Sequence, residues 1–412
     1  MRLSEELQKR GFVYQYSAES LEEILDGPPR TVYLGIDPTA DALHVGHLVP
    51  FMLLNHLLRA GHSVYLLIGG GTAMIGDPGG RDTERPLVEP SVIKNQAEAL
   101  ESNVRKIAVA DIHFVNNYDW LSGLSALTFL RDVGKHFTVN AMVKKDAIAS
   151  RMESENGISY TEFSYALLQS YDYWHLHTTY GCDLQIGGSD QWGNLVSGVD
   201  FVRRTTGNTV HALTMALIVD KATGKKFGKS MGNAVWLDAE KTSPYQLYQF
   251  WLQTNDESVI EYLKLFTFLS LDEIAGIELT QRNSPELRTA QYRLADEVVS
   301  FVHGKTAALT ARQISEVLFG TATLSELQDA DLAVLRKEAP YIKITPETLL
   351  SAVLLESGLA RSKREARDFL NAGAVTVDNI KVFEDSVMSA FVSGLVLVRR
   401  GKRQCVVVEW VA

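Results

Sequence analysis

Residues 31–47 read TVYLGIDPTADALHVGH, and this stretch decides the fold. Its apolar run from Thr31 to Ile36 has the length and composition of a buried strand, and Asp37-Pro38-Thr39 turns the chain. A helix carrying His44 and His47 is expected to follow. A strand that leads through a tight turn to a helix N-terminus forms the phosphate-binding crevice of α/β folds. An ordinary βα connection has the same pattern, so the neighbouring segments must distinguish the two interpretations.

The segments that follow alternate between helix and strand. Residues 48–60 have a helical pattern, and 63–68 (SVYLLI) form a second continuous apolar run. A further strand is expected over 112–116 (IHFVN). Strands that are apolar on both faces and alternate with helices are typical of a parallel sheet that is covered on both sides. The sequence therefore predicts a doubly wound, mostly parallel α/β domain.

A long helix predicted over 160–176 carries a polar stripe. Tyr165, Gln169 and Asp172 stand at positions i, i+4 and i+7, which puts them on one face of this helix. The rest of the helix is largely apolar, and a solvated face would carry charged and small polar residues instead. The stripe indicates one wall of a pocket for a small polar ligand, with a solvated face as the open alternative.

A glycine-rich loop, GGGTAMIGDPGG over 69–80, follows the second strand. It lacks the Gly-Lys-Ser/Thr ending of a nucleotide P-loop, so its glycines are interpreted as places where the backbone passes close to a ligand. Asp77 is a candidate partner for a cationic group, and Arg81 and Arg85 are candidates for an anionic one. A solvated surface loop is the alternative.

A second glycine loop, LQIGGSDQWGN over 184–194, leads from a strand into a helix. Gly187 and Gly188 permit close approach of a ligand, and an Asp such as Asp190 accepts from ribose hydroxyls in many α/β nucleotide sites. Helix capping by Ser189 or Asp190 needs no ligand and is the alternative.

The segment 221–230 (KATGKKFGKS) is strongly basic. The spacing of its glycines does not match a Walker loop. We expect a mobile loop in which Lys226, Lys229 and Ser230 close over phosphates, and a solvated basic turn is the alternative.

The chain is predicted to have several parts. We expect an α/β domain over 1–220 with a helical insertion near 120–150, a mobile loop and linker over 221–242, an α-helical domain over 243–325, a linker over 326–346, and a small α+β domain over 347–412. Apolar helices in the insertion suggest a subunit interface. Between 358 and 403, nine Lys or Arg stand against five Asp or Glu, a net charge of +4 in a chain whose formal charge is −10. This reversal favours RNA contact over a merely solvated face; the basic helix there carries Arg361, Lys363, Arg364 and Arg367. A pair of strands around 374–382, with its turn at Asp378 and Asn379, is expected to follow this helix.

Composition sets the general class of the protein. With 46% hydrophobic and 22% charged residues, the 412-residue chain is typical of globular proteins with a large core. Cys182 and Cys405 are its two cysteines and suggest neither a zinc site nor a disulfide framework, which fits a reducing compartment. No apolar run is long enough for a membrane span, and the N-terminus lacks a signal peptide's apolar region. We expect a cytoplasmic protein.

Together these motifs resemble one family over the whole chain and in order. HVGH at 44–47 and KFGKS at 226–230 match the two signatures of class I aminoacyl-tRNA synthetases. The stretches YLGIDPTADALHVGH, GDPGGRDTER and LQIGGSDQWGN, with the Tyr165/Gln169/Asp172 helix, resemble the bacterial type of tyrosyl-tRNA synthetase. The tail is similar to the S4-type RNA-binding domain of these enzymes. The resemblance implies a Rossmann-like catalytic domain and tRNA(Tyr) as a partner, with the protein acting as a homodimer.

The resemblance also implies a two-step reaction and a set of roles. Tyrosine and ATP would give tyrosyl-adenylate and pyrophosphate, and the tyrosyl group would then move to the tRNA 3′ end, with Mg²⁺ accompanying ATP and no metal held by the protein alone. The implied phosphate-contacting and catalytic residues are Thr39, His44, His47, Arg81, Arg85, Lys226, Lys229 and Ser230. The implied tyrosine-binding residues are Tyr33, Asp37, Asp77, Tyr165, Gln169, Asp172 and Gln191. Those implied for the rest of ATP are Gly46, Gly188, Asp190 and Lys229.

Two alternatives stand beside this interpretation. A tryptophanyl-tRNA synthetase shares the signatures, but Tyr33 and Asp172 suit a phenol hydroxyl better than an indole, which has one donor and no acceptor. A non-catalytic RNA-binding relative would not need the signatures and the tyrosine pocket together. At Arg81 many relatives have Lys, which keeps the charge and changes the geometry of donation.

Overall fold

The structure is a computed structural model, and its chain forms two compact units. One unit comprises Met1–Thr242 and Thr254–Leu294, and the other Ser243–Gln253 and Ala295–Ala412. The residues that the structure describes are 1–79, 88–154, 157–218, 227, 229–230, 233–391, 394–401 and 404–410. Within them, no helix is long and apolar enough to cross a membrane.

The first unit is built on a six-stranded sheet, counted over the described residues. Its strands are β1 (Gln15–Tyr16), β2 (Thr31–Ile36), β3 (Ser63–Ile68), β4 (His113–Asn116), β5 (Leu184–Gly188) and β6 (His211–Met215). Their order is β1-β6-β5-β2-β3-β4, and every pair is parallel except β1 with β6. The predicted strands over 31–36 and 63–68 are confirmed, as is the mostly parallel sheet.

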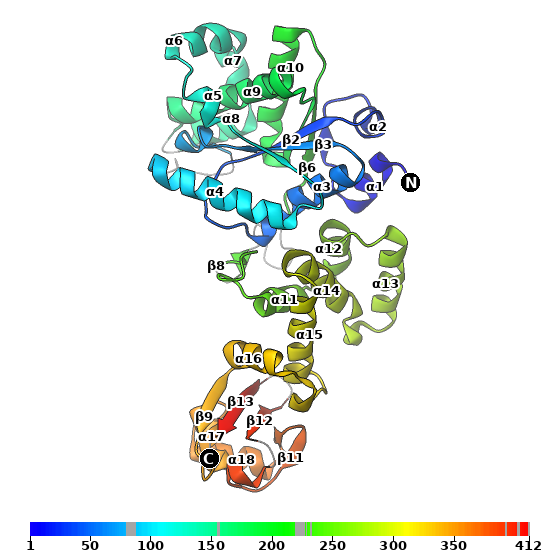
Figure 1. Ribbon diagram of the computed structural model, residues 1–412, viewed down its shortest axis with the longest axis vertical. Coiled ribbons are helices and arrows are strands. Elements are labelled where there is room, and N and C mark those ends of the chain that lie inside the picture. Colours follow the sequence, from blue (N-terminus) through cyan, green and yellow to red (C-terminus); the bar gives the residue numbers. More distant parts are fainter. Residues whose placement is uncertain are drawn as a thin grey trace. The chain divides into compact units, whose positions relative to one another are not determined.

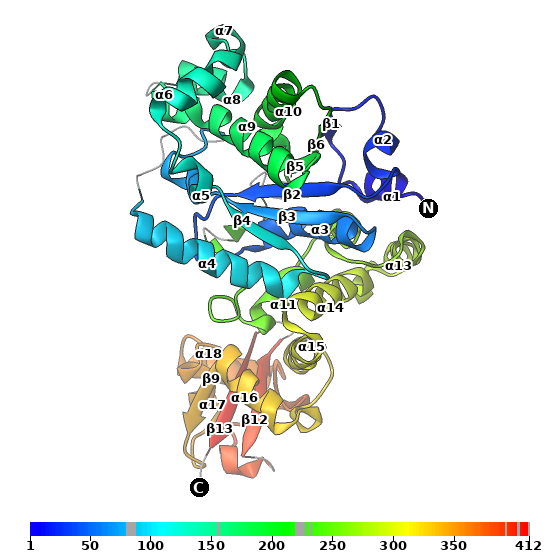
Figure 2. The ribbon, with the colours of Figure 1, turned by 45° about the horizontal axis from the view of Figure 1, so that its top comes forward.

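Helices cover both faces of this sheet. Figure 2 shows α9 (Tyr160–Tyr180) and α10 (Trp192–Thr206) on one side of the strands, and α3 (Leu48–Arg59) and α4 (Pro90–Ile107) on the other. The apolar run of α3 is almost wholly buried, and Pro50 fits because it stands in the first turn, where no intrahelical N–H bond is lost. The doubly wound fold class is confirmed.

Shorter helices complete the first unit (Figure 1). They are α1 (Leu3–Arg10), α2 (Leu21–Leu25), α5 (Tyr118–Leu121), α6 (Ala126–Thr128), α7 (Val139–Met142), α8 (Asp146–Glu153), α12 (Val259–Phe266) and α13 (Leu271–Asn283). The insertion predicted near 120–150 thus consists of short helices, with a π-helical turn at Phe129–Val133. A short antiparallel pair joins β7 (Lys229–Ser230) and β8 (Asn233–Ala234).

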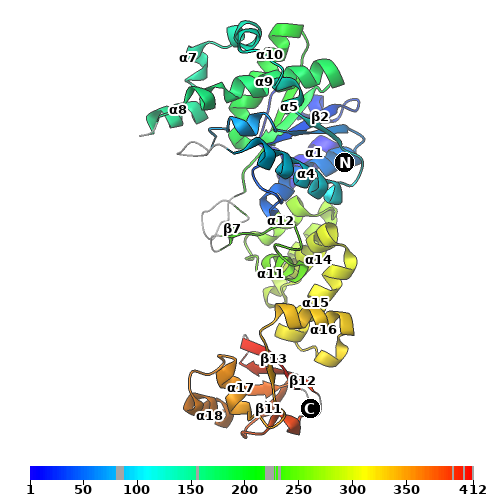
Figure 3. The same ribbon diagram turned by 60° about the vertical axis from the view of Figure 1, so that its left-hand side comes forward.

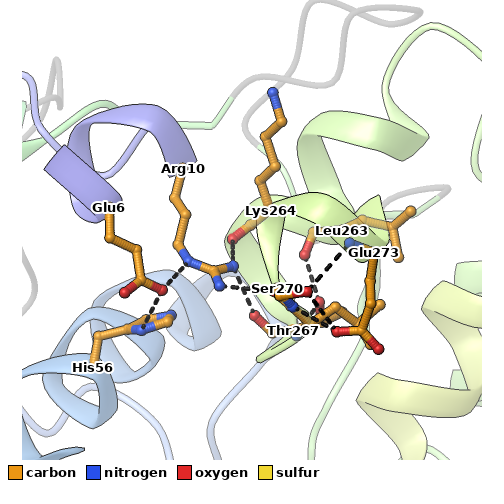
Figure 4. A network of polar contacts seen from close by, with 9 residues as sticks. Glu6, Arg10, His56, Leu263, Lys264, Thr267, Ser270 and Glu273 are labelled. Atoms are coloured by element: carbon orange, nitrogen blue, oxygen red, sulfur yellow. Dashed lines mark hydrogen bonds and ion pairs between the residues drawn. The ribbon is translucent and has the colours of Figure 1, made fainter. Parts of the chain in front are cut away.

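A buried arginine fastens α12 to the N-terminal helix α1 (Figure 4). Arg10 is 3% exposed and donates to the carbonyl oxygens of Lys264 at 3.2 Å, Thr267 at 3.3 Å and Leu269 at 2.7 Å. Its Nε also donates to Glu6 at 2.9 Å. A helix end leaves carbonyl groups without intrahelical partners, and a cation satisfies them well. This network fixes the position of α12 in the unit.

The second unit contains helices and a five-stranded sheet, counted over the described residues. Its helices are α11 (Pro244–Leu252), α15 (Lys305–Phe319), α16 (Asp329–Glu338), α17 (Leu350–Glu356) and α18 (Lys363–Asn371), and α14 (Thr289–His303) crosses the boundary between the units. Its strands are β9 (Tyr341–Ile344), β10 (Val375–Val377), β11 (Ile380–Val382), β12 (Leu395–Arg400) and β13 (Gln404–Trp410), in the order β11-β10-β12-β13-β9. Figure 3 shows α17 and α18 beside this sheet, and their buried apolar residues share one core with it.

The structure corrects one expectation and confirms another in this unit. Residues 326–346 were expected to be a linker, but they contain α16 and the strand β9. Strand β9 pairs in parallel with β13, which lies more than sixty residues later in the chain. A short apolar strand such as YIKI carries little local signal when its partner lies more than sixty residues away. The predicted hairpin turn is confirmed: Asp378 and Asn379 have φ angles of 47° and 68°, as a tight two-residue turn requires. The domain boundaries stay a prediction.

Candidate functional site

The candidate site lies where the strand order of the first sheet reverses, between β2 and β5. Tyr33 on β2 stands opposite Gln185 on β5 in the parallel register. In doubly wound folds, ligands bind in the crevice beyond the carboxyl ends of the strands at this point. Two adjoining cavities of about 360 Å³ and 420 Å³ lie there and share Gly35, His47, Gly187, Asp190 and Gln191.

The first cavity is closed at its deep end by Tyr33 and Asp172. Tyr33 is 0% exposed, and its hydroxyl has no hydrogen-bond partner among the described residues. Asp172 is 1% exposed and accepts from Nδ2 of Asn117 at 2.9 Å and from Nε1 of Trp120 at 2.8 Å. Burial raises the pKa of Asp172 to about 7, against the lowering effect of these two bonds. The pair presents a hydroxyl and an acidic group to a ligand.

Acidic groups line the middle of the cavity. Asp37 accepts from the hydroxyl of Tyr165 at 3.0 Å and from that of Thr72 at 2.8 Å. Asp77 accepts from Nε2 of Gln191 at 2.5 Å. Burial, with the nearby charge of Asp37, holds the pKa of Tyr165 well above its usual value, so Tyr165 stays a neutral donor. Two carboxylates held in this way suit a cationic group.

Two glutamine side chains in the cavity have buried oxygens without a partner among the described residues. These are Oε1 of Gln169 and Oε1 of Gln185. An unpaired buried carbonyl costs about 1–3 kcal/mol, so such atoms persist where a ligand satisfies them. Gln169 was predicted, whereas Gln185 was missed because a single polar residue in a buried strand resembles a structural one.

The predicted helix face is confirmed as one wall of this cavity. Tyr165, Gln169 and Asp172 all line it from α9. The predicted residues that line it are Tyr33, Asp37, Thr39, His47, Asp77, Tyr165, Gln169, Asp172, Asp190 and Gln191. Asn117, Trp120 and Thr72 were missed, because their roles depend on contacts with Asp172 and Asp37 far along the chain.

The two histidines have their tautomers fixed by the backbone. His44 N donates to Nδ1 of His47, and Gly46 N donates to Nδ1 of His44, both at 3.1 Å. Since each Nδ1 accepts from an N–H, a neutral ring carries its proton on Nε2. The rings stack with centroids 3.9 Å apart. Burial and the neighbouring His44 lower the pKa of His47 to about 3, so His47 is a neutral donor.

The second cavity brings together both signature motifs. It is lined by His44, Gly46, His47, Gly188, Asp190 and Phe227, among others. A Cβ at Gly46 would lie 2.8 Å from the His44 ring and 3.2 Å from the carbonyl oxygen of Phe227, so glycine is required there. Phe227 packs against Tyr262 and Phe266 of α12, with ring centroids 5.0 and 5.4 Å apart.

For several predicted site residues, the structure does not describe the side chain. Arg81, Arg85 and Lys226 lie outside the described residues, and Lys229 and Ser230 are described only as the backbone of β7. Their predicted roles stay predictions. In the second unit, the basic side chains of Arg361, Lys363, Arg364 and Arg367 are all exposed, at or next to α18.

The chain matches two family models. Residues 26–320 match the model described as tRNA synthetases class I (W and Y). Residues 331–408 match the model of the tyrosine–tRNA ligase SYY-like C-terminal domain. The second match begins in α16 and includes β9, in agreement with the five-stranded sheet.

Relatives and solved structures agree with these matches. The chain is 44% identical to the tyrosine–tRNA ligase of Staphylococcus saprophyticus, over 99% of each chain, and 43% identical to that of Streptococcus mutans, over 100% of each. A C-terminally truncated mitochondrial tyrosyl-tRNA synthetase of Aspergillus nidulans superposes with a TM-score of 0.70 at 32% identity, over 77% of this chain and 94% of that one. A tryptophanyl-tRNA synthetase of Encephalitozoon cuniculi, at 14% identity and a TM-score of 0.56 over 81% of this chain and 92% of that one, shares the fold. Because its sequence identity to full-length tyrosine–tRNA ligases is 43–44%, the chain belongs to the tyrosine–tRNA ligases of the class I tRNA synthetase family.

Proposed function

We propose that the two adjoining cavities bind tyrosine and ATP side by side. The enzyme attaches tyrosine to tRNA, with ATP as the energy source. The observation that carries the assignment of the first cavity is the unpartnered hydroxyl of Tyr33, buried at its deep end with Asp172. A phenol hydroxyl is both donor and acceptor, so it donates to the Asp172 carboxylate and accepts from Tyr33.

The remaining polar groups of the first cavity suit the amino-acid end of tyrosine. Asp77, Tyr165 and Gln169 surround the ammonium group, and Asp37 and Gln191 help to position the amino acid and the adenylate that forms from it. Phenylalanine has no hydroxyl and would leave the buried Tyr33 hydroxyl without a partner and Asp172 without a third hydrogen bond, and an unsatisfied buried polar group costs about 1–3 kcal/mol. This difference in hydrogen bonding accounts for the selection of tyrosine over phenylalanine.

The second cavity suits ATP. Gly46 and Gly188 let the nucleotide approach the backbone, and Asp190 accepts from the ribose. Thr39, His44 and His47 hold phosphate oxygens through hydroxyl and imidazole donors. Positive charge at the pyrophosphate comes from Arg81, Arg85, Lys226 and Lys229. Ser230 adds a hydroxyl donor, and Mg²⁺ enters as part of the ATP substrate. The tyrosine carboxylate attacks the α-phosphorus and pyrophosphate leaves, so the protein aligns the reactants and stabilises the leaving charge.

The exposed basic residues of α18 are proposed to contact the backbone of tRNA(Tyr). The chain is also proposed to form a homodimer in the cytoplasm. Support for the dimer comes from large apolar side chains exposed on neighbouring segments of the first unit: Leu127 (82%), Val139 (63%) and Tyr160 (70%). Leu127→Glu is expected to yield monomers in sedimentation equilibrium, and an unchanged mass would contradict this interface.

The phosphate role of the second signature is tested with Lys229→Ala. We expect slower tyrosine-dependent ATP–pyrophosphate exchange and an unchanged dissociation constant for tyrosine, because the lysine stabilises the leaving pyrophosphate and does not touch the amino acid. An equal loss of tyrosine binding would contradict the role. Exchange measured with each of the twenty amino acids tests the first cavity, since activation of tryptophan would contradict its assignment.

A further inference from the structure

The segment that follows the second signature forms a clasp with the first signature. Val45 N donates to the carbonyl oxygen of Val235 at 2.9 Å, and Leu237 N donates to that of Leu43 at 2.7 Å. His44 and Trp236 form the antiparallel bridge between these two bonds. About 190 residues separate the two segments along the chain, so the clasp is a tertiary feature. We name the residues 235–237 and 43–45 the signature clasp.

The side chain of Trp236 lies against His44. Their rings meet edge to face, with centroids 6.2 Å apart and an interplanar angle of 61°. On its other side, His44 stacks on His47 at 3.9 Å. The ring of His44 therefore makes aromatic contacts with both Trp236 and His47, and edge-to-face and offset-stacked contacts are the favoured arrangements of aromatic rings.

Further contacts hold Trp236 in place. Its backbone N–H donates to Oγ1 of Thr242 at 3.0 Å. Lys241 Nζ lies 5.2 Å from the centre of the indole and pairs with the carboxylate of Asp41 at 2.7 and 2.8 Å. The lysine thus joins the indole to the loop that precedes the first signature, as a cation over an aromatic face.

We propose that Trp236 is a positioning residue for adenylate formation: through the signature clasp it orients His44, and with it the His44–His47 stack, toward the phosphates of ATP. The inference rests on the proposed contact of His44 with ATP. The direction of each Nε2–H in the stack depends on how firmly the two imidazole rings are held. A small rotation of such a donor lowers the rate, because the donor no longer points at the charge that develops in the transition state. Trp236 itself touches neither substrate in this mechanism.

The test is a double-mutant cycle with Trp236→Leu and His44→Ala in the full-length enzyme. In the otherwise unchanged chain, Trp236→Leu should lower kcat for tyrosine-dependent ATP–pyrophosphate exchange about tenfold and leave the KM for tyrosine unchanged. In the His44→Ala background, the same substitution should change kcat less than twofold, because the residue it positions is gone. Trp236→Phe keeps an aromatic edge and should retain most of the rate.

A nitrogen NMR measurement separates positioning from a general loss of structure. The His44 imidazole should show a protonated Nε2 in the unsubstituted chain. Trp236→Leu should give a mixture of tautomers, because a His44 ring that is free to turn loses the hydrogen bond from Gly46 N–H that fixes its tautomer. Leu279→Ala, on the exposed side of α13 at 62% exposure, serves as the control and should change neither the rate nor the His44 signal.

The outcomes distinguish the two proposals. If His44→Ala does not slow exchange, the proposed phosphate role of His44 fails. If His44→Ala is slow and the effect of Trp236→Leu is equally large with and without His44, or the His44 signal is unchanged, the positioning role of Trp236 is wrong and the phosphate role stands.

Discussion

Nε1 of Trp120 donates a 2.8 Å hydrogen bond to Oδ1 of Asp172, from a position 52 residues away in the chain. Asn117 donates to the other oxygen, so each oxygen of the carboxylate accepts one hydrogen bond from the protein. The carboxylate is held by one donor from Asn117, directly after β4, and one from Trp120 in α5, and Asp172 lines the cavity together with Tyr33. In the proposed tyrosine pocket, recognition of the phenol hydroxyl would therefore depend on residues that do not contact it.

The first prediction concerns Trp120. Trp120→Phe keeps the ring but removes the donor, so Asp172 loses one of its two fixed bonds and turns more freely. We expect kcat/KM for tyrosine in ATP–pyrophosphate exchange to fall about tenfold, as for the loss of one hydrogen bond to a charged group. The value for phenylalanine should change little, so discrimination falls with it. Equal losses for both amino acids would contradict this account.

The second prediction concerns pH. Burial raises the pKa of Asp172 to about 7 from an ordinary value near 3.8, so between these values the folded enzyme holds a proton that the unfolded chain has released. The stability this group contributes is therefore complete below about pH 4 and is lost as pH rises through 7. Relative to Asp172→Asn, which does not titrate, the free energy of unfolding should fall by about 1–3 kcal/mol between pH 5 and pH 8.

Tyrosine should reverse part of that dependence. The ionised carboxylate is the better acceptor for a phenol, so tyrosine affinity of the unsubstituted chain should rise as pH increases through 7. Urea unfolding and tyrosine titration at pH 5, 6.5 and 8 measure both effects. A stability difference from Asp172→Asn that stays constant with pH would show that the carboxyl titrates at its ordinary pKa.

The third prediction concerns Gln185. Gln185→Met keeps the length of the side chain and removes an unpaired carbonyl, so the free energy of unfolding should rise by about 1 kcal/mol. Tyrosine-dependent ATP–pyrophosphate exchange should slow several-fold, because the Gln185 oxygen that has no partner in the empty cavity is expected to bind the substrate. The matched control is Gln281→Met: Gln281 is 5% exposed but donates to Asp256 at 2.8 Å, and its loss should destabilise the chain without slowing exchange. A destabilised Gln185→Met would contradict the assignment.

The fourth prediction concerns the hydrogen bonds from Arg10 that hold α12 against α1. Arg10→Met removes three hydrogen bonds to carbonyl oxygens near the end of that helix and leaves them buried, so the free energy of unfolding should fall by about 2–4 kcal/mol. Lys9→Met is the control, since Lys9 is exposed and pairs with Glu5 one turn away; its effect should stay within about 0.5 kcal/mol. Similar losses for both variants would show that the capping of α12 contributes little.

The fifth prediction concerns the basic face of α18. Replacing Arg361, Lys363, Arg364 and Arg367 together by Gln should raise the KM for tRNA and reduce the dependence of tRNA charging on salt, because fewer counterions are released on binding. ATP–pyrophosphate exchange without tRNA should not change, which controls for folding. Unimpaired charging at physiological salt would rule out this face as a tRNA contact.

The sequence by itself determined the parts of this protein that depend on short-range patterns. The apolar runs of β2 and β3 are buried on both faces, and the stripe of Tyr165, Gln169 and Asp172 follows from helical spacing alone. The turn at Asp378 and Asn379 follows from residues that tolerate positive φ. In each case the physical cause lies within a few residues, so local reading was sufficient.

The tertiary structure decided what joins distant segments. Strand β9 completes a sheet with β13, Asn117 and Trp120 orient Asp172, and Trp236 contacts His44 from about 190 residues away in the chain. Gln185 became a site residue only when β5 was placed beside β2, with an unpaired oxygen at the cavity. Such contacts leave no periodic signal in the sequence, because the local conformation of each residue is the same whether or not its distant partner is present. Their role follows from burial and hydrogen bonding, which exist only once the chain has folded.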